Sequence, residues 1–357
     1  MVKPLTALAI TALLASAQDR PRLHPQPAQS KNSKTGPEVG SRIPPIDALD
    51  QTGKRQTFES LRGPQGMLLV FTRSADWCPY CKSQMVDLNQ QLASFRKQGL
   101  TVATITYDSA AILKHFAERQ QIKYAMLSDP ESKIIRAFGI FNENTEKGTR
   151  GYGIPYPGVY VLDEKGVVKS KYFEDDYTER YSAASILTHE FNADGVQKTT
   201  TETPHLKLTT SASDTKFAPG RRITLIAEMD LKPGLHVYAP GVEYGYIPIA
   251  WSIAESKSWA AFPAAFPKAR TMEFAALKEI VPVYEGKLRL VRDVTIGNEA
   301  EVAQALTPDR TLTVEGTFRY QACDDKECFP PRSLPLKWTF QLGKLDTERV
   351  PEAIQHK

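Results

Sequence analysis

The chain has 357 residues, of which 41% are hydrophobic and 24% are charged, a composition typical of a folded globular protein rather than a disordered one. Its length suits two domains of ordinary size. The 45 lysines and arginines nearly balance the 41 aspartates and glutamates, without long runs of one sign, and this excludes the basic footprint of a nucleic-acid-binding protein.

The first seventeen residues differ in character from everything that follows. Lys3 provides a basic start, residues 4–14 an apolar core, and Ala15-Ser16-Ala17 a small-residue cleavage pattern, which together indicate a secretory signal peptide over residues 1–17. An uncleaved membrane anchor is the alternative, although the apolar run is short for a membrane span. No later run approaches about 18 apolar residues, so we expect a soluble periplasmic or secreted protein.

Residues 18–37 are rich in proline, glutamine, serine and lysine and show no apolar period, which predicts a flexible tether. Beyond them, alternating apolar strands and amphipathic helices predict a layered α/β domain over residues 38–192. The expected strands are residues 67–72, 100–107, 124–127, 159–162 and 167–172, and the expected helices are residues 82–97, 110–119, 130–138 and 180–191.

The motif Trp77-Cys78-Pro79-Tyr80-Cys81 stands where an expected buried strand gives way to an expected helix. A cysteine in the first turn of a helix lies near unpaired backbone N–H groups and the positive end of the helix dipole, which favour its thiolate. We therefore predict thiol–disulfide exchange, with Cys78 as the exposed nucleophile and Cys81 as the resolving cysteine. A structural disulfide is the alternative, but so short a loop would constrain the unfolded chain little. A zinc site would need further ligands nearby.

This order of strand, Trp-Cys-x-x-Cys motif and long helix, followed by Tyr156-Pro157-Gly158-Val159, resembles the thioredoxin superfamily. Within it, the chain looks most like the redoxin branch that contains peroxiredoxin-like and TlpA-like proteins, and the resemblance covers about residues 38–191. It implies a thioredoxin fold and a cis peptide bond before Pro157, or alternatively before Pro155, facing the cysteine pair. The substrate contacts that it implies come from Trp77, Pro79, Tyr80, Tyr156 and Pro157.

Two features depart from the redoxin pattern. Peroxiredoxin-type peroxidases carry Pro-x-x-x-Thr-x-x-Cys, whereas Phe71 and Ala75 stand in the Pro and Thr positions before Cys78, and alignment on the second cysteine puts Ser74 and Cys78 there. TlpA-like reductases often carry an acidic residue shortly after the second cysteine, where this chain has Gln84. We therefore expect disulfide exchange, and a thiol peroxidase is the alternative function.

The chain after this domain changes its pattern. Residues 193–204 are polar and predict a linker. Short strands separated by turns then predict an antiparallel β-sandwich over residues 205–343, and residues 344–357 form a tail. The expected strands are residues 205–210, 222–229, 236–238, 249–253, 287–296, 311–320 and 335–341.

A second cysteine pair lies in this half, in the stretch from Tyr320-Gln321-Ala322-Cys323 to Cys328-Phe329-Pro330-Pro331. With residues 234–238 and 283–286, it resembles the amino-terminal, immunoglobulin-like domain of the disulfide reductase DsbD, over about residues 205–343. The resemblance implies a dithiol that passes electrons to thioredoxin-fold partners. Three acidic residues between the cysteines disfavour thiolate formation, which suits a carrier that waits for attack. A static hairpin disulfide is the alternative.

Three further side chains deserve an interpretation. His236 is expected to be a packed histidine, because no second histidine stands at metal-ligand spacing. Tyr284 and Tyr320 are candidates to cover the second cysteine pair, although aromatic residues in a sandwich usually belong to the core.

The predicted fold class is therefore an α/β thioredoxin fold followed by an all-β immunoglobulin-like sandwich. The predicted function is that of an exported thiol–disulfide oxidoreductase, in which Cys78 and Cys81 exchange electrons with Cys323 and Cys328 or with a membrane reductase. The expected partners are protein disulfide substrates and a thioredoxin-fold protein or membrane disulfide reductase, and we expect no nucleic acid, metal or cofactor. A non-enzymatic assembly module with structural disulfides is a third hypothesis.

Overall fold

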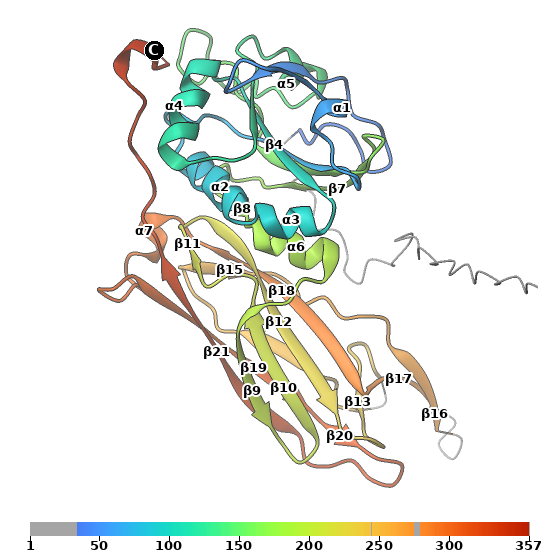
Figure 1. Ribbon diagram of the computed structural model, residues 1–357. Helices are drawn as coiled ribbons and strands as arrows, with labels where there is room; N and C mark the ends of the chain where they lie inside the picture. The colour runs from blue at the N-terminus through green and yellow to red at the C-terminus, as the bar shows by residue number, and fades with distance from the viewer. Residues whose placement is uncertain (1–33, 244, 275–278, 357) are drawn as a thin grey trace, which may run out of the picture.

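The structure is a computed structural model that describes residues 34–243, 245–274 and 279–356. Figure 1 shows an N-terminal α/β body stacked on a C-terminal body made almost entirely of β-sheet. The predicted signal peptide and residues 18–33 of the predicted tether lie outside the described residues. In the part of the chain that is described, no helix is long and apolar enough to cross a membrane.

The N-terminal domain is a seven-stranded sheet with helices on both faces. Its elements in chain order are β1 (Asp47–Asp50), β2 (Arg55–Thr57), α1 (Phe58–Leu61), β3 (Met67–Phe71), α2 (Pro79–Gln90), α3 (Leu92–Lys97), β4 (Thr101–Thr106), α4 (Ala110–Gln120), β5 (Ala125–Ser128), α5 (Lys133–Ala137), β6 (Gly158–Leu162), β7 (Val168–Phe173), β8 (Arg180–Tyr181) and α6 (Ala183–Phe191). The strand order of the sheet is β2-β1-β5-β4-β3-β6-β7.

Strand β3 lies near the centre of this sheet because all five of its residues are apolar and buried. It runs parallel to β4 and antiparallel to β6. Alternate side chains of a strand point to opposite faces, so Leu68 and Val70 belong to one core cluster and Met67, Leu69 and Phe71 to the other. Helices α2, α3, α4 and α6 contribute to the first cluster and α1 and α5 to the second, which places the carboxyl end of β3 between two packed layers.

The expected helix over residues 82–97 starts earlier and is interrupted. Helix α2 begins at Pro79, and Gln91 separates α2 from α3. The helix expected from residue 130 begins only at Lys133. Residues 34–37 of the predicted tether also lie against the domain, because Tyr160 Oη donates to Thr35 O at 2.8 Å and Lys171 Nζ to Thr35 Oγ1 at 3.0 Å.

The C-terminal domain is a β-sandwich. Its elements are β9 (Val196–Glu202), β10 (Leu206–Ala212), β11 (Lys216–Phe217), β12 (Arg221–Leu231), β13 (His236–Tyr238), β14 (Ala250–Ile253), β15 (Trp259–Ala261), β16 (Arg270–Phe274), β17 (Glu279–Glu285), β18 (Lys287–Ile296), α7 (Glu299–Val302), β19 (Thr311–Tyr320), β20 (Ala322–Cys323) and β21 (Arg332–Leu342), followed by a short 3-10 turn, η1 (Glu352–Ile354). The main sheets have the orders β15-β18-β12-β10-β9 and β11-β21-β19-β14, and β16-β17-β13-β20 form a further small sheet.

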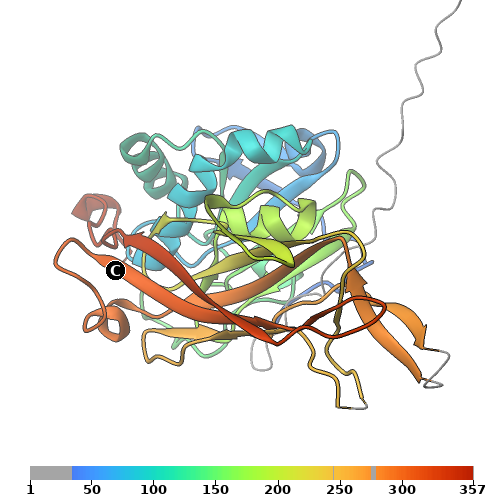
Figure 2. The same ribbon diagram turned by 90° about the horizontal axis from the view of Figure 1, so that it is seen from below.

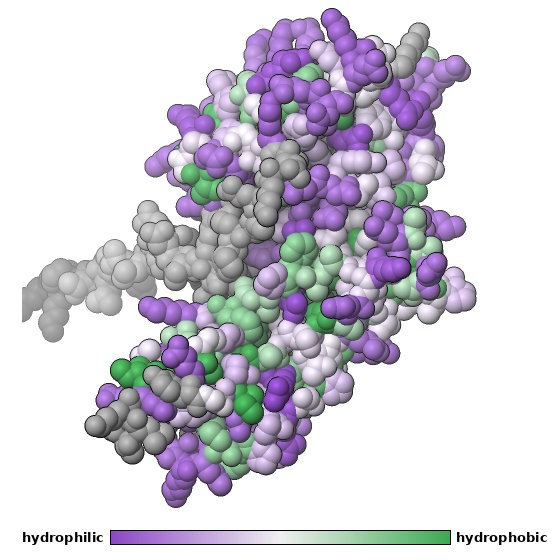
Figure 3. Space-filling view, turned by 180° about the vertical axis from the view of Figure 1, so that it is seen from behind, coloured by the Kyte–Doolittle hydropathy of each residue, from purple (hydrophilic) through white to green (hydrophobic). Residues whose placement is uncertain are grey.

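The two main sheets of the sandwich share one apolar core. Leu225 and Leu290 from the first sheet belong to the same cluster as Val314, Trp338 and Phe340 from the second. The expected strands 236–238, 287–296 and 311–320 are confirmed as β13, β18 and β19. Figure 2 shows the β16–β17 hairpin projecting from the sandwich. On the face in Figure 3, apolar residues gather mainly on the C-terminal body, whereas the N-terminal body is mostly polar.

The predicted linker over residues 193–204 is largely a strand. Residues 196–202 form β9, which pairs antiparallel with β10 at the edge of the sandwich. All seven side chains of β9 are exposed, so the strand carries no apolar period that a sequence pattern could detect. Backbone pairing and cross-strand contacts such as Thr200 Oγ1 to Thr209 Oγ1, 3.0 Å, hold it in place.

The expected helix over residues 180–191 begins three residues late. Ser182 is the N-cap of α6, and its Oγ accepts a hydrogen bond from Ser185 N at 3.0 Å, so the helix starts at Ala183. A serine cap satisfies an N–H group that the first turn leaves free. The two residues before the cap remain extended as strand β8.

Strand β8 joins the two domains because it pairs in parallel with β12. Arg180 N donates to Gly220 O, and Ser182 N donates to Arg222 O, both at 2.9 Å. Charged contacts reinforce this junction, since Arg222 lies 2.8 Å from the buried carboxylate of Glu174. The thioredoxin-like sheet and the sandwich are therefore linked by main-chain hydrogen bonds as well as by side chains.

The tail predicted over residues 344–357 is bound to the N-terminal domain. This C-terminal segment (residues 344–356) runs from the end of β21 back to α4 (Figure 1). Asp346 pairs with Arg119 at 2.6 Å, and the buried Lys82 donates from Nζ to Glu348 O at 2.6 Å. Val350 is buried in the same core cluster as α2 and α4.

The end of the C-terminal segment contacts two buried carboxylates. Arg349 Nε donates to Asp76 Oδ1 at 3.0 Å, and its Nη2 contacts the other oxygen of Asp76. His356 Nε2 lies 2.7 Å from Asp108 Oδ1, and its ring stacks on Tyr107 with centroids 4.1 Å apart. Asp76 and Asp108 are fully buried, so the segment supplies partners that these side chains need.

Replacing Arg349 with Met should destabilise the protein by about 2 kcal/mol, because the buried Asp76 carboxylate loses a charged hydrogen-bond partner. Burial raises the pKa of Asp76, but hydrogen bonds from Arg349 and from the backbone N–H groups of His356 and Val350 hold it below its usual value. The stability that ionised Asp76 contributes is therefore fully present above the pKa of an unfolded aspartate, about 4. It is lost as the pH falls through the lower pKa that Asp76 has in the folded protein.

Urea unfolding at pH 7 and at pH 3 measures this difference. The difference in the free energy of unfolding between the wild type and Arg349→Met should be smaller at pH 3 than at pH 7. The control Arg96→Met, on the exposed surface of α3, should change the free energy of unfolding little at either pH. An equal effect of the two substitutions at pH 7 would show that the C-terminal segment does not stabilise the domain.

Candidate active sites

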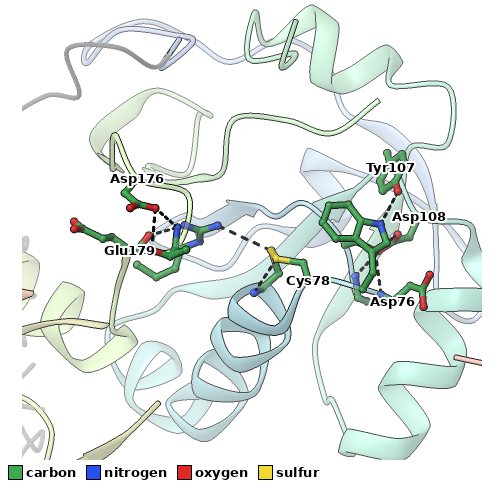
Figure 4. Close-up of a disulfide and its surroundings, with 12 residues drawn as sticks. Asp76, Cys78, Tyr107, Asp108, Asp176 and Glu179 are labelled. Atoms are coloured by element: carbon green, nitrogen blue, oxygen red, sulfur yellow. Dashed lines mark hydrogen bonds between the residues drawn. A yellow bond between two sulfur atoms is a disulfide. The ribbon is translucent and has the colours of Figure 1, made fainter. Parts of the chain in front are cut away.

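Cys78 and Cys81 form a disulfide at the N-terminus of α2, as Figure 4 shows. Cys78 is the N-cap of the helix, and its Sγ accepts a hydrogen bond from Cys81 N at 3.3 Å. Pro79 follows at the first helical position, where a missing N–H leaves no hydrogen bond unmade. The sulfur of Cys78 therefore takes the place that a capping oxygen has in other helices, next to N–H groups that would stabilise a thiolate.

Both cysteines of this pair are buried, with Cys78 1% and Cys81 0% exposed. The prediction of Cys78 as an exposed nucleophile is therefore wrong for the closed, oxidised arrangement. Neighbouring side chains form a stacked layer in which the Arg73 guanidinium lies 4.8 Å from the centroid of the Trp77 ring and 4.3 Å from that of Tyr177. Tyr177 belongs to the connection between β7 and β8, so the segment that leads into the domain junction also packs at the motif.

The other predicted contact residues lie at different places around the motif. Trp77 is half-buried and donates from Nε1 to Tyr107 Oη at 2.8 Å. Tyr80 faces the C-terminal domain, because a side-chain carbon at Gly220 would approach its ring to 3.0 Å. Tyr156 is half-buried, and its hydroxyl accepts a hydrogen bond from Asn144 Nδ2 at 3.0 Å.

The predicted cis-proline is wrong. Across the described residues no peptide bond is cis, so the bond before Pro157 is trans, and so is that before Pro155. Trans is the favoured state of an X–Pro bond by about 0.5–1 kcal/mol. The local hydrogen bonding suits it, since Phe141 bridges to Pro155 and Tyr156 N donates to Ile140 O at 2.7 Å. The buried Pro157 thus leads directly into β6 in an extended chain.

Arg180 lies against the cysteine pair and was not singled out from the sequence. Its Nη2 is 4.0 Å from Cys81 Sγ, although the two residues are 99 positions apart. Burial, together with the positive charges of Arg221 and Arg73, lowers the pKa of Arg180 to about 9. No sequence pattern marks this residue, because the β8–β12 pairing that carries it to the motif is a tertiary contact.

Asp108 was also missed, and it fixes the loop before Cys78. Its Oδ1 accepts from Ser74 Oγ at 2.8 Å, and its Oδ2 accepts from Ala75 N at 2.6 Å. Asp108 follows β4, the parallel neighbour of β3. Because the carboxyl ends of parallel strands meet at one edge of a sheet, a polar residue after β4 is a signal that sequence reading could have used.

The second disulfide, between Cys323 and Cys328, lies in the small sheet at the far end of the sandwich. Cys323 is buried and Cys328 is exposed. Tyr238 contacts the pair, with its hydroxyl 3.7 Å from Cys328 Sγ. Asp324 accepts from the backbone N–H groups of Lys326 and Glu327 at 2.7 and 2.8 Å, and these bonds close the hairpin between the cysteines.

Two of the residues expected to cover this pair are engaged elsewhere. The hydroxyl of Tyr320 donates to Thr203 Oγ1 at 2.9 Å, and that of Tyr284 donates to Pro267 O at 2.7 Å. His236 is buried, as expected, but it is the cross-strand partner of Cys323. Burial lowers its pKa, against the opposing influence of nearby carboxylates, so a neutral imidazole stands beside the second disulfide.

The Cys78–Cys81 disulfide lies at the N-terminus of α2, near the end of the sandwich where β12 begins, whereas β20, which carries Cys323, lies at the far end of the sandwich (Figure 1). Strand β12 spans the distance, because Arg221 at its start pairs with Arg180, beside Cys81, and Leu231 at its end precedes the strand that pairs with Cys323. From the first to the last of its 11 residues there are ten steps of about 3.3 Å, so β12 is about 33 Å long. The sulfurs of the two pairs are therefore too far apart to exchange directly in this arrangement.

Within residues 34–243, 245–274 and 279–356, no group of three or more potential metal-ligating side chains occurs. The chemistry that the two sites offer is accordingly that of their sulfurs. A disulfide is attacked by a thiolate through a mixed-disulfide intermediate, and access to the attacked sulfur governs the rate.

Two family models match the chain over separate stretches. The AhpC/TSA family matches residues 39–171, and the N-terminal domain of the thiol:disulfide interchange protein DsbD matches residues 204–336. The chain joins a redoxin domain to a DsbD-type N-terminal domain. Each stretch contains one of the two disulfides. The predicted fold class, a thioredoxin fold followed by an immunoglobulin-like sandwich, is confirmed.

Relatives of the redoxin domain are peroxiredoxins. The chloroplastic peroxiredoxin Q of Sedum lineare is 29% identical over 142 residues, which are 40% of this chain and 72% of that protein. Alkyl hydroperoxide reductase C of Staphylococcus aureus is 28% identical over 144 residues, 39% of this chain and 70% of that protein. Peroxidoxin BcpB from Mycobacterium tuberculosis, a solved structure, is 20% identical with a TM-score of 0.34, and the match covers 39% of this chain and 86% of that one.

Electron exchange between the redoxin pair and the DsbD-type pair should be intermolecular, because the length of β12 separates them. We expect its rate to rise linearly with protein concentration. The measurement mixes reduced Cys78→Ser/Cys81→Ser protein with oxidised Cys323→Ser/Cys328→Ser protein, quenches in acid and counts alkylated cysteines by mass spectrometry. The partly reduced wild type is the comparison. If its two pairs exchange electrons faster than the mixed variants do, at a rate independent of protein concentration, the expected separation of the pairs is contradicted.

Proposed function

We propose that this protein is an exported thiol–disulfide oxidoreductase that reduces protein disulfides through Cys78 and Cys81. The observation that carries the proposal is the position of Cys78 Sγ at the N-cap of α2, where it accepts the Cys81 N–H. This environment stabilises a thiolate on the cysteine that begins the reaction. Export is inferred from the secretory pattern of residues 1–17 and from the DsbD-type domain.

In the proposed reaction the reduced Cys78 thiolate attacks one sulfur of a substrate disulfide. A bond forms between Cys78 and that sulfur, and the second substrate sulfur leaves as a thiolate. Cys81 then attacks Cys78 Sγ, the Cys78–Cys81 bond forms, and the first substrate sulfur leaves. Two electrons pass from the dithiol to the substrate. Because both cysteines are buried in the closed arrangement, side chains around the pair must move to admit the substrate.

We infer that the second pair exchanges electrons with a protein outside the chain. Cys328 is the exposed sulfur of its disulfide, so an incoming thiolate would attack it and release Cys323. The partner would be a thioredoxin-fold protein or a membrane disulfide reductase. The distance between the two pairs supports a route through a partner or a second copy rather than direct transfer within one chain.

The variant Cys81→Ser, in a Cys323→Ser/Cys328→Ser background, should accumulate a mixed disulfide at Cys78, because the resolving sulfur is absent. Incubation of the reduced variant with insulin, followed by non-reducing mass spectrometry, would reveal the adduct. The matched control Cys78→Ser should form none. If neither variant captures insulin, the nucleophile assignment is wrong and the assembly-module hypothesis gains support.

A thiol peroxidase is the second candidate, favoured by the names of the relatives. Three observations weigh against it. Phe71 and Ala75, in the positions of the peroxidatic Pro and Thr, are buried, and Ser74, which the other alignment puts in the Pro position, directs its hydroxyl to Asp108 at 2.8 Å. These positions therefore offer no hydroxyl group to a peroxide.

Peroxide consumption separates the two functions. With dithiothreitol as donor, we expect the wild type to consume hydrogen peroxide no faster than Cys78→Ser/Cys81→Ser. A rate that depends on Cys78 and exceeds the rate of insulin reduction would favour the peroxidase.

A further inference from the structure

Arg180 places a positive charge against Cys81, the resolving cysteine. Its guanidinium Nη2 lies 4.0 Å from Cys81 Sγ, and Nη1 donates to Glu179 O at 2.5 Å. The side chain is 3% exposed, and its Nε has no hydrogen-bond partner in the described part of the chain. Cys81 is the neighbour that can take up a negative charge at hydrogen-bond distance.

The charge of Arg180 is poorly balanced while the disulfide is closed. In the described ranges no carboxylate forms an ion pair with it, and the carboxylates that act on it electrostatically, Glu174 and Asp176, do so from farther away. Glu174 is paired with Arg222, and burial raises its pKa to about 8. A buried cation without a counter-charge is unfavourable, so a thiolate on Cys81 would supply what is missing.

The other charges around the pair do not offset this one. Arg221, which is buried, and Arg73, which is half-buried, are further cations whose charges act against that of Arg180. Arg221 faces Asp87 and Asp214, which offset part of its charge. Lys82, next to Cys81 in the chain, is turned to Asp346 and Glu348 of the C-terminal segment, and Asp76 is occupied by Arg349. The surroundings of Cys81 are therefore positive.

The position of Arg180 is set by the domain junction. Its backbone N–H donates to Gly220 O at 2.9 Å within the β8–β12 pairing. Gly220 has a φ of +80°, and a side-chain carbon there would lie 2.4 Å from Thr178 O. The segments around Thr178 and Gly220 therefore approach closely only because residue 220 is glycine. The C-terminal domain thus holds the arginine at the cysteine of the N-terminal domain.

We propose that Arg180 holds Cys81 as a thiolate whenever the Cys78–Cys81 disulfide is reduced, which readies Cys81 to resolve a mixed disulfide on Cys78. The inference rests on the proposed function and adds a positioning residue to it. Where a TlpA-like acidic residue would accept the proton of the resolving thiol, this chain has Gln84. A resolving cysteine that is already ionised needs no such base. Its sulfur attacks Cys78 Sγ, the new S–S bond forms, and the substrate sulfur leaves as a thiolate.

The test measures the ionisation of Cys81 in the full chain with Cys78, Cys323 and Cys328 replaced by serine. The pH dependence of iodoacetamide labelling and of thiolate absorbance near 240 nm should give a midpoint that rises by about one pH unit in Arg180→Met, a tenfold lower thiolate-to-thiol ratio. Arg180→Lys, which keeps the positive charge, should have a midpoint close to that of the protein with Arg180. Arg96→Met should leave the midpoint unchanged. An unchanged midpoint in Arg180→Met would overturn the inference.

Folding of the variants is checked independently by circular dichroism and urea unfolding. Arg180→Met removes a buried, unpaired charge and keeps a similar volume, so the oxidised protein should be no less stable. If Arg180→Met nevertheless fails to fold, Arg180→Gln repeats the midpoint measurement with a neutral, hydrogen-bonding side chain, and its unchanged midpoint would overturn the inference equally.

A second readout connects the residue to turnover. In the chain with all its cysteines, Arg180→Met should prolong the mixed disulfide with insulin about tenfold and lower the reduction potential of the pair by about 30 mV, the equivalent of a tenfold change for a two-electron couple. A shifted midpoint without any insulin reduction by the wild type would refute the proposed function alone. Insulin reduction with an unmoved midpoint would refute the inference alone.

Discussion

The parallel pairing of β8 with β12 is the contact on which the rest of this structure depends. The two residues of β8, which precede the Ser182 cap of α6, pair with the first two residues of β12, an interior strand of the sandwich, through main-chain hydrogen bonds. This pairing fixes the DsbD-type domain against the N-terminus of α2, and it carries Arg180 to the cysteine pair. Because the hydrogen bonds are made by the backbone, the pairing itself uses no side chain, and Gly220 permits the close approach because it has none.

The junction also explains why so much charge is buried in this chain. Arg222 bridges Glu174, Tyr181 and Thr295, and His189 pairs with Asp293 at 2.8 Å. Burial opposes the charged form of both partners, but their mutual attraction raises the pKa of His189 and lowers that of Asp293. Such buried groups require close partners, and the two domains supply them to each other.

The redoxin site is therefore enclosed by three segments that are remote in sequence. The β7–β8 connection contributes Tyr177, the sandwich contributes Gly220, and the C-terminal segment binds Asp76 and Asp108 beside the motif. By contrast, the DsbD-type disulfide presents Cys328 at the surface of a small sheet. The molecule thus combines a buried disulfide beside one end of the sandwich with a disulfide at the other end in which Cys328 is exposed.

The sequence by itself determined the local chemistry and the two fold classes. A buried apolar strand before Cys78, helical periodicity after it and turn-separated strands in the second half depend on neighbouring residues, so they could be predicted, and β13, β18 and β19 were found at the predicted residues. The cis-proline was wrong. Residues 193–204 and 344–357, predicted as a linker and a tail, contain strand β9 and a segment bound to the N-terminal domain. Backbone isomer, edge pairing and docking of a terminus depend on contacts distant in sequence.

Only the tertiary structure decided that Cys78 is enclosed, that Arg180 stands beside Cys81 and that about 33 Å of strand separates the two disulfides. Each of these facts follows from one cause. Strand β8 pairs with β12 across 40 intervening positions by backbone hydrogen bonds. Such bonds can form with almost any side chain at the paired positions, so they leave no pattern in the sequence.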